Sequence, residues 1–398
     1  MIVNRIRNMA GHGRGLLLAL SGLLLVLAGS APDVRAGSRV VAWGAGSFVA
    51  SPPDLNDYGQ SIVPANLTNA VLVAGGWRHS VALKAGGTLQ GWGYDYFGQI
   101  DFPTGSNYAA IACGDLFSLA LNSDGTVTAV GDGFYGQTAV PANASNVVAV
   151  SCGFYHCLVL KTDGTVVAWG GQGDIDYGQG VVPTNGESNV VAVAAGGYHN
   201  LVLKSDGSLF AWGDNRDGET NIPAGLSNVV AIAAGGFHNL ALGANGTVAA
   251  WGLDNFGQTD VPTDLSNVVA IAAGSFHNLA LKSNGTVVAW GENTEGVTNV
   301  PANLTNVVQI AAGDFHSLAL VRTNPPMRRT VVVQPNFETN GFRVTVPTQN
   351  GRVYQLQYKN SLTDDVWQSL SLYAGTGGNL QLTDPVVATQ RCYRVEQW

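Results

Sequence analysis

The feature that most constrains this sequence is a unit of 38 to 43 residues that recurs seven times between residues 37 and 321. Each copy carries a glycine three residues before a position that is His in six copies and Phe in one. Six copies also carry a Trp-Gly pair, and Val130-Gly131 fills the remaining place. Self-similarity at a fixed period of this length is typical of solenoids and propellers. The glycines are Gly76, Gly114, Gly153, Gly196, Gly235, Gly274 and Gly313.

Each unit is predicted to be β rather than α. Valine-rich runs of five to seven residues are separated by Asp-Gly or Asn-Gly pairs, such as Asp163-Gly164 and Asn284-Gly285, which are typical of two-residue hairpin turns. Three strands, with room for a short outer fourth, make one antiparallel sheet per unit. Seven such sheets in tandem predict a seven-bladed β-propeller over residues 37–321.

The two ends of the repeat region predict that the ring is closed. The region begins with a lone strand that ends in Trp43-Gly44, and its last unit lacks a Trp-Gly strand of its own. We therefore expect the first strand to complete the last blade, which removes the open edges. An open solenoid would instead need polar caps at both ends.

Residues 1–36 are interpreted as a signal peptide. Arg5, Arg7 and Arg14 precede an apolar run over 15–29, and Val34-Arg35-Ala36 has the small or branched residues of a cleavage site. The run is shorter than the roughly 20 residues of a membrane span. We expect a secreted protein, extracellular or periplasmic, with no membrane span.

The residues after the repeats are predicted to form a second module. Residues 322–335, with Pro325-Pro326, are interpreted as a linker. Beyond them the apolar residues alternate, as in Phe342, Val344 and Val346, which favours a small β-sandwich over 336–398. The predicted fold class is all-β, a seven-bladed propeller with a small C-terminal β-sandwich.

Charge and motifs exclude several classes of function. Residues 37–321 hold 7 basic and 21 acidic side chains, a net charge of −14, whereas nucleic-acid binding needs clustered Lys and Arg. The sequence contains no Gly-x-Ser-x-Gly, His-Glu-x-x-His or phosphate-loop motif. We expect a monomeric, non-catalytic protein that binds no nucleic acid, metal or other cofactor.

The repeat also resembles a known family. The Ala-Gly-x-x-His-Ser/Asn-x-Ala-Leu stretch, followed by Asp/Asn-Gly-Thr-Val and Trp-Gly-x-Asn-x-x-Gly-Gln, resembles the regulator-of-chromosome-condensation repeat. Its short period and Val-Pro-Ala link resemble especially the secreted bacterial β-lactamase inhibitor protein of that superfamily, itself a seven-bladed propeller. The resemblance covers about 38–321. Through the eukaryotic relatives it also implies guanine-nucleotide exchange on a small GTPase, against which export and the acidic charge argue.

The residues just before the His position are the candidate partner-binding residues. They lie in the turn between the first two strands, which in a propeller opens onto one face, and an exposed aromatic rim is typical of a binding surface. In the inhibitor, such aromatic residues meet the target enzyme. Arg78 and Leu116 depart from the pattern, and packing between blades is the alternative. The candidates are Tyr155, Tyr198, Phe237, Phe276 and Phe315, with Trp77 nearby.

The six repeat histidines are predicted to be structural. Metal ligands must converge on one ion at about 2 Å, whereas equivalent residues of successive blades diverge around an axis. We expect each imidazole to bond a backbone carbonyl within its own blade. They are His79, His156, His199, His238, His277 and His316.

Three cysteines are candidates for a disulfide. Cys113 and Cys152 take the same place in adjacent blades, directly before the glycine, where the Cα separation of about 5–6 Å that a disulfide needs is within reach. Cys157 is an alternative partner for Cys152.

The function predicted from these patterns is that of a secreted, non-catalytic protein that binds another protein through one propeller face. The alternative is adhesion to a glycan or cell surface through a second loop set, in which aromatics stand beside Gly-Gln, as at Phe134-Tyr135-Gly136-Gln137 and Asn255-Phe256-Gly257-Gln258. A hydrolase or lyase would require carboxylates clustered at one mouth of the channel.

Overall fold

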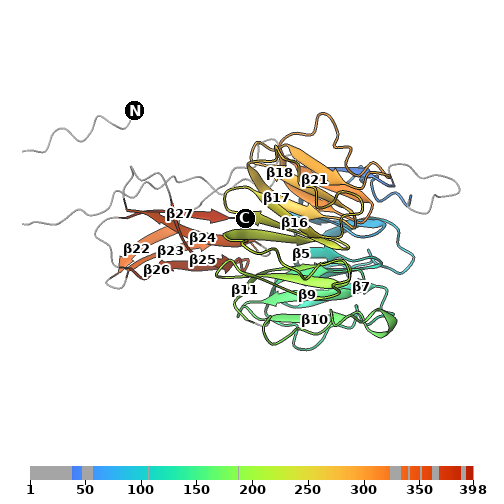
Figure 1. Cartoon of the computed structure of the whole chain (residues 1–398). Coiled ribbons are helices and arrows are strands. Elements are labelled where there is room, and N and C mark those ends of the chain that lie inside the picture. The colour runs from blue at the N-terminus through green and yellow to red at the C-terminus, as the bar shows by residue number, and fades with distance from the viewer. Residues whose placement is uncertain are drawn as a thin grey trace, which may run out of the picture.

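The computed structural model describes residues 38–46, 57–105, 107–186, 188–322, 333–338, 341–349, 352–360, 367–386 and 391–397. Figure 1 shows two bodies in these residues, a ring of small sheets and a smaller orange-to-red pair of sheets beside it. The one helical turn described is η1 (Gly173–Ile175). The predicted fold class, a seven-bladed propeller with a small C-terminal β-sandwich, is confirmed.

Each blade is a three-stranded antiparallel sheet, and the described residues contain no fourth strand in any blade. The first strands of neighbouring blades pack against one another around the ring, so they line its axis. In chain order, blade 1 holds β2 (Ala70–Gly75), β3 (His79–Lys84) and β4 (Leu89–Gly93); blade 2 holds β5 (Tyr108–Cys113), β6 (Phe117–Asn122) and β7 (Val127–Gly131); blade 3 holds β8 (Val147–Cys152), β9 (His156–Lys161) and β10 (Val166–Gly170); blade 4 holds β11 (Val190–Ala195), β12 (His199–Lys204) and β13 (Leu209–Gly213); blade 5 holds β14 (Val229–Ala234), β15 (His238–Gly243) and β16 (Val248–Gly252); blade 6 holds β17 (Val268–Ala273), β18 (His277–Lys282) and β19 (Val287–Gly291); and blade 7 holds β20 (Val307–Ala312), β21 (His316–Val321) and β1 (Arg39–Gly44).

The ring closes through β1, as predicted. This strand pairs antiparallel with β21, with Val40 opposite Leu320 and Trp43 opposite Ser317. The indole N–H of Trp43 donates to the Val297 carbonyl over 2.7 Å, and four other blade tryptophans donate to equivalent carbonyls, namely Trp92, Trp169, Trp251 and Trp290. The first strand of the region therefore serves as the third strand of the last blade.

The middle strand of each blade is the best-buried element, which explains its residue pattern. Five of its six residues are buried in every blade, and the sixth is partly exposed. Apolar residues on both faces fit a strand that is covered by a neighbouring blade on each side. The partly exposed place is held by Lys in four blades.

The expected hydrogen bonds of the histidines were wrong in one respect. Each imidazole bonds a side chain of the next blade rather than a carbonyl of its own blade. His238 Nε2 lies 2.7 Å from Asn278 Oδ1, and His79 Nε2 lies 2.8 Å from Ser118 Oγ. The residue after each His turns its side chain toward the preceding blade, so two blades share the pair. Where His is replaced by Phe117, the next blade offers Cys157, and the two share an apolar cluster.

The C-terminal module is a sandwich of two three-stranded sheets, as predicted. One sheet has the order β22 (Val333–Glu338), β23 (Gly341–Pro347), β26 (Asn379–Asp384), and the other has β25 (Gln368–Ala374), β24 (Val353–Lys359), β27 (Cys392–Gln397). Phe342, Val344, Leu356, Leu382 and Val395 form its core. The strand β22 begins inside the segment 322–335 that we assigned to a linker. The predicted signal peptide, 1–36, lies outside the described residues.

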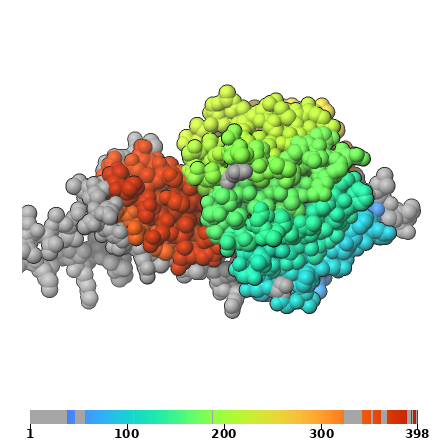
Figure 2. Space-filling view, turned by 90° about the horizontal axis from the view of Figure 1, so that it is seen from below, coloured from blue at the N-terminus to red at the C-terminus, as the bar shows by residue number. Residues whose placement is uncertain are grey.

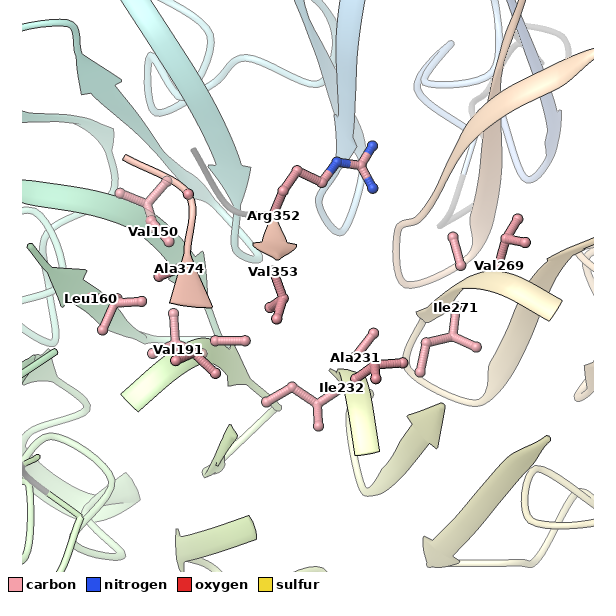
Figure 3. A pocket seen from close by; sticks show the side chains of 16 residues that line it. Val150, Leu160, Val191, Ala231, Ile232, Val269, Ile271, Arg352, Val353 and Ala374 are labelled. Carbon is pink, nitrogen blue, oxygen red and sulfur yellow. The ribbon is translucent and has the colours of Figure 1, made fainter. Parts of the chain in front are cut away.

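The module packs against one end of the propeller (Figure 2). The Leu372 N–H donates to the Ser205 carbonyl in a turn between second and third strands, and Val353 joins the core cluster of Val191 and Val230. A cavity of about 210 Å³ remains between them, and Arg352 and Val353 of the module are among the residues that line it (Figure 3). We call this the module end and the opposite one the open end.

The described residues include no helix long and apolar enough to cross a membrane.

Candidate functional site

The repeat glycines meet around the axis at the open end. A Cβ at Gly235 would lie 2.5 Å from the Gly274 carbonyl oxygen and 2.4 Å from His238 Cε1, and the same relation continues around the ring until Gly313 meets the Gly76 oxygen at 2.5 Å. Real Cβ atoms do not approach that closely, so only glycine lets the seven blades come together here. The turns that follow these glycines are thereby gathered around one small opening.

Four of the predicted binding residues form a continuous row at the open end. The ring centroids of Tyr155 and Tyr198 lie 6.2 Å apart, those of Tyr198 and Phe237 6.3 Å, and those of Phe237 and Phe276 5.4 Å. Phe154, next to the axis, contacts the rings of Tyr198 and Phe237. The turns of blades 3 to 6 therefore present one aromatic row.

The loops that follow the third strands join this row, although we expected them to form a separate surface. Tyr135 lies 4.9 Å from Tyr155, Tyr177 lies 5.5 Å from Tyr198 and Phe256 lies 5.4 Å from Phe276, all between ring centroids. The two loop sets form one surface because both emerge at the same end of the blades. We call it the aromatic face: Phe134, Tyr135, Phe154, Tyr155, Tyr177, Tyr198, Phe237, Phe256 and Phe276.

Several apolar side chains in these loops are unusually exposed to solvent. Phe134 is 82% exposed and Phe256 is 52% exposed. In the described part of the propeller, the exposed large apolar side chains all lie in the loops after third strands at the open end. They are Ile62, Tyr96, Phe97, Phe134, Tyr177, Val181 and Phe256.

A buried glutamine holds the aromatic residue of these loops in place. The Gln258 side-chain oxygen accepts the backbone N–H of Phe256 over 2.8 Å, and Gln137 and Gln179 accept those of Tyr135 and Tyr177 in the same way. The three glutamines are fully buried. They therefore fix the loop conformation and do not contribute hydrogen-bonding groups to the surface.

The remaining two predicted binding residues lie apart from this row. The Arg78 guanidinium lies over the Trp77 ring, 3.5 Å from its centroid, and 4.9 Å from the centroid of the Tyr58 ring. Phe315 is partly buried in blade 7, where its carbonyl accepts the N–H of Ala45. Blade 1 has Arg78 where most blades have an aromatic residue, so it places a cation against the Trp77 and Tyr58 rings.

A small pocket of about 60 Å³ opens on the axis within the glycine ring, lined by residues from all seven blades. Asp115 of blade 2, Asp314 of blade 7 and Ser275 of blade 6 are among the residues that line it. Burial raises the pKa of Asp115 well above its usual range, the neighbouring Asp314 carboxylate raises it further, and burial raises the pKa of Asp314 to about 6. Two buried acids this close cannot both be charged at low cost, so the pair holds a proton to higher pH than exposed carboxyls do.

Comparison with known proteins fits this architecture. The model of the regulator of chromosome condensation (RCC1) repeat matches residues 70–99, 108–137, 147–179, 190–219, 229–258 and 268–297. The chain belongs to the RCC1 repeat family. Each matched RCC1 repeat begins with the first strand of a blade and ends at the loop position that is Gln in four of the six.

Solved structures share the RCC1 fold at low sequence identity. Prp20p of Saccharomyces cerevisiae is 20% identical with a TM-score of 0.60, and the match covers 72% of this chain and 92% of that one. Human WBSCR16 is 20% identical, with a TM-score of 0.54 and coverage of 72% and 99%. The ectodomain of the Physcomitrella patens receptor kinase CR4 is 20% identical, with a TM-score of 0.53 and coverage of 81% and 93%. No curated protein matches the sequence. The further resemblance to the bacterial inhibitor stays a prediction.

Sequence reasoning missed the axial carboxyl pair of this RCC1 propeller. The residue after each repeat glycine varies among the blades, and only two blades place an acid there. Alignment of the seven copies would have shown both acids at one position of the repeat, next to the axis. The carboxylates that we required for a hydrolase or lyase do cluster, but in a pocket of about 60 Å³.

The three cysteines of the RCC1 propeller are free thiols in the structure. Cys152 lies opposite Cys157 in the register of blade 3, and Cys113 takes the equivalent place in the adjacent first strand. Burial raises the pKa of both Cys113 and Cys152, which lowers their reactivity. The disulfide between Cys113 and Cys152 stays a prediction.

Proposed function

We propose that this RCC1-repeat protein binds another protein against the aromatic face. The observation that carries the proposal is the contiguity of that face, since aromatic side chains from five successive blades touch one another and several are largely exposed. Soluble monomers rarely expose such patches unless they serve as binding surfaces, and aromatic residues dominate the energetics of protein interfaces. Among the described residues, the module occupies the other end of the channel and the open end is left for a partner.

Structural neighbours support a protein as the ligand. Prp20p has binding properties toward Gsp1p and histones, and it has been crystallised with Kap60 bound. The net charge of −14 over 37–321 argues against a nucleic-acid partner and against phosphate-rich ligands generally. Nucleotide exchange, implied by the eukaryotic relatives, has less support in this chain.

The same features favour binding over catalysis and protein over glycan. A pocket of about 60 Å³ has room for about two water molecules and not for a sugar ring. The glutamines that suggested sugar recognition are buried under the loops, so they offer no hydrogen bonds to a glycan. We therefore propose a monomeric, non-catalytic protein without a cofactor.

A capture experiment tests the aromatic face. The full chain is immobilised beside a variant with Phe134→Ser, Tyr177→Ser and Phe256→Ser, and proteins are captured from culture of the source organism. We expect a partner that binds the wild type at least about 100-fold more tightly than the variant, since each lost aromatic anchor costs about 1–2 kcal/mol. Val386→Ser in the module is the matched control, because Val386 is 49% exposed. Equal capture by wild type and the triple variant would refute the proposal.

We also propose that the protein is exported, on the basis of the basic residues and apolar run of residues 1–36. Mass spectrometry of the protein recovered outside the cytoplasm is expected to show a mature N-terminus at Gly37. A full-length protein found in the cytoplasm would contradict this expectation.

A further inference from the structure

The axial pocket holds polar atoms that lack hydrogen-bond partners. Asp115 Oδ1 has none although Asp115 is only 7% exposed, and Ser275 Oγ, in a residue only 3% exposed, has no partner besides the Asp314 carboxyl. Asp314 interacts with both residues. Its carboxylate raises the pKa of Asp115, and a hydrogen bond from Ser275 lowers the pKa of Asp314. Buried polar atoms are nearly always paired, and an unpaired one costs about 1–3 kcal/mol.

The atoms left unpaired indicate the chemistry of a missing partner. Two carboxyl groups and a hydroxyl, from blades 2, 7 and 6, face one small space. All three accept hydrogen bonds, and carboxylates do so best from a cation. A group with three donors, a positive charge and a small radius matches this set, which describes a primary ammonium.

Arg78, the cation that interacts with both acids, does not fill this role. The Arg78 guanidinium is stacked on Trp77 and Tyr58 rather than placed in the pocket, whose lining residues do not include it. Its charge lowers the pKa of both Asp115 and Asp314 without donating to the unpaired Asp115 oxygen. Tyr155 and Ser275 each hydrogen-bond one of the two acids, but Asp115 Oδ1 is left without a donor.

The pocket opens directly onto the aromatic face. Phe154 lines the pocket and its ring lies 5.4 Å from that of Tyr198, and Tyr155 interacts with the Asp115 carboxyl. An alkyl chain that crosses these rings would pack against apolar surface, and an ammonium at its end would meet ring faces and then carboxylates. This sequence of environments matches a lysine side chain.

We propose that the axial pocket binds the ammonium group of a lysine side chain presented by the partner protein. This inference rests on the proposed function, because the aromatic face supplies the surrounding contacts. A lysine fits better than an arginine, since a planar guanidinium needs paired acceptors in one plane whereas the three acceptors here come from three blades. The lysine would act as a specificity contact at the centre of the interface.

Binding of the ammonium is coupled to a proton. Burial raises the pKa of both acids, so the Asp115–Asp314 pair holds a proton to higher pH than two exposed carboxyls would. The groups that face the pair are Arg78, Tyr155 and each other, with Tyr198 beyond. A lysine ammonium favours the doubly ionised pair, so its entry releases the shared proton to solvent. Affinity for lysine is therefore expected to rise as the pH is raised from about 5.5 to 7.5.

Blocked peptides of the form acetyl-Ser-Leu-Xaa-Leu-Ser-amide, with Xaa as Lys, Arg or norleucine, test the pocket by NMR titration of the full chain. We expect the Lys peptide to bind about 10-fold more tightly than the norleucine peptide, which corresponds to about 1.4 kcal/mol. The double variant Asp115→Asn with Asp314→Asn is expected to bind both peptides equally. Ser275→Ala, which removes one acceptor without a change of charge, is expected to lose part of the preference.

Controls separate this proposal from the proposed function. Asp101→Asn with Asp260→Asn removes the same two charges from exposed open-end loops and is expected to keep the lysine preference. The aromatic triple variant is expected to weaken all three peptides alike. Equal binding of the Lys and norleucine peptides, or tighter binding of the Arg peptide, would overturn the lysine pocket and leave the aromatic face intact. If no peptide binds the wild type, the lysine pocket is overturned, and the capture experiment decides the aromatic face independently.

Discussion

His316 Nε2 lies 2.8 Å from Ser80 Oγ, although 236 residues separate the two along the chain. The pair joins blade 7 to blade 1 and is one of six equivalent bonds between neighbouring blades. Blade 3 joins blade 4 through His156 and Asn200, and blade 6 joins blade 7 through His277 and Ser317. The ring is therefore closed twice, by the strand β1 and by a circle of side-chain contacts.

One junction between neighbouring blades lacks the histidine bond, and it suggests a double substitution that would replace such a bond elsewhere in the ring. Phe117 and Cys157 replace the His and Asn or Ser of the other blades, and Cys157 donates to the Gln137 carbonyl as Asn278 does to the Gln258 carbonyl. We expect His238→Phe alone to cost about 1–3 kcal/mol, because Asn278 Oδ1 is left buried without a donor. His238→Phe with Asn278→Cys is expected to recover most of this loss.

Urea unfolding of the wild type, both single variants and the double variant measures the coupling in a double-mutant cycle. A coupling energy near zero would show that the two positions do not form a unit, in contradiction of the contact between blades.

The buried histidines predict a loss of stability in mild acid. Burial lowers the pKa of all six, to about 3 in His79, His277 and His316 and to about 4 in His156, His199 and His238. The unfolded chain takes up protons near pH 6.5, whereas the native histidines do not until far lower pH. Their contribution is therefore complete above pH 6.5 and is lost as the pH falls toward 4, at about 1 kcal/mol per histidine by pH 5.5.

The axial acids act in the opposite direction but are fewer. Because their pKa is raised in the folded state, Asp115 and Asp314 favour folding as the pH falls. Urea unfolding at pH 7.5 and 5.5 is expected to show a net loss of several kcal/mol, smaller in the His238→Phe, Asn278→Cys variant. Equal stability at the two pH values would refute the neutral, buried state of the histidines.

The glycine ring predicts a sharp contrast between two Gly→Ala substitutions. At Gly235 the new Cβ would meet backbone of blade 6 and a fully buried imidazole, so neither neighbour can move easily. We expect a cost of about 3 kcal/mol or more, as for other overpacked sites. Gly86→Ala is the control, since no atom lies within 4 Å of its Cβ position and its φ is not in the left-handed range. Differential scanning calorimetry would contradict the ring if both variants melted at the same temperature.

Much of this architecture could be predicted because it repeats. The Trp-Gly strand, the Asx-Gly turns and the unpaired strand that ends at Trp43 each follow from local pattern and count, and the structure confirms the propeller they indicate. The partner of each histidine could not be predicted in this way. It depends on the rotation from one blade to the next, which places Asn278 rather than a carbonyl of blade 5 beside His238.

The candidate site was predictable only in part, for the same reason. The row from Tyr155 to Phe276 follows from one repeat position, but its union with Phe256 and Tyr177 depends on how the loops fold over their buried glutamines. Asp115 and Asp314 depart from the repeat and lie in blades at opposite ends of the chain order. Only the closed ring brings the two carboxyls together.

Because β1 closes the ring, we expect replacement of Trp43 and of Trp251 by Ala to have different effects on association and amide exchange. Trp43 and Trp251 are both 7% exposed, and the indole N–H of each donates to a loop carbonyl, so replacement by Ala should cost about 3–5 kcal/mol in either case. The strand of Trp251 is tied to its neighbour by the Asn245-Gly246 turn, whereas β1 has no such turn to β21. We expect Trp43→Ala alone to free the edge of β21, with faster amide exchange in Leu318 and Leu320 and concentration-dependent association. If Trp251→Ala associates equally, the ring does not depend on β1 for its closure.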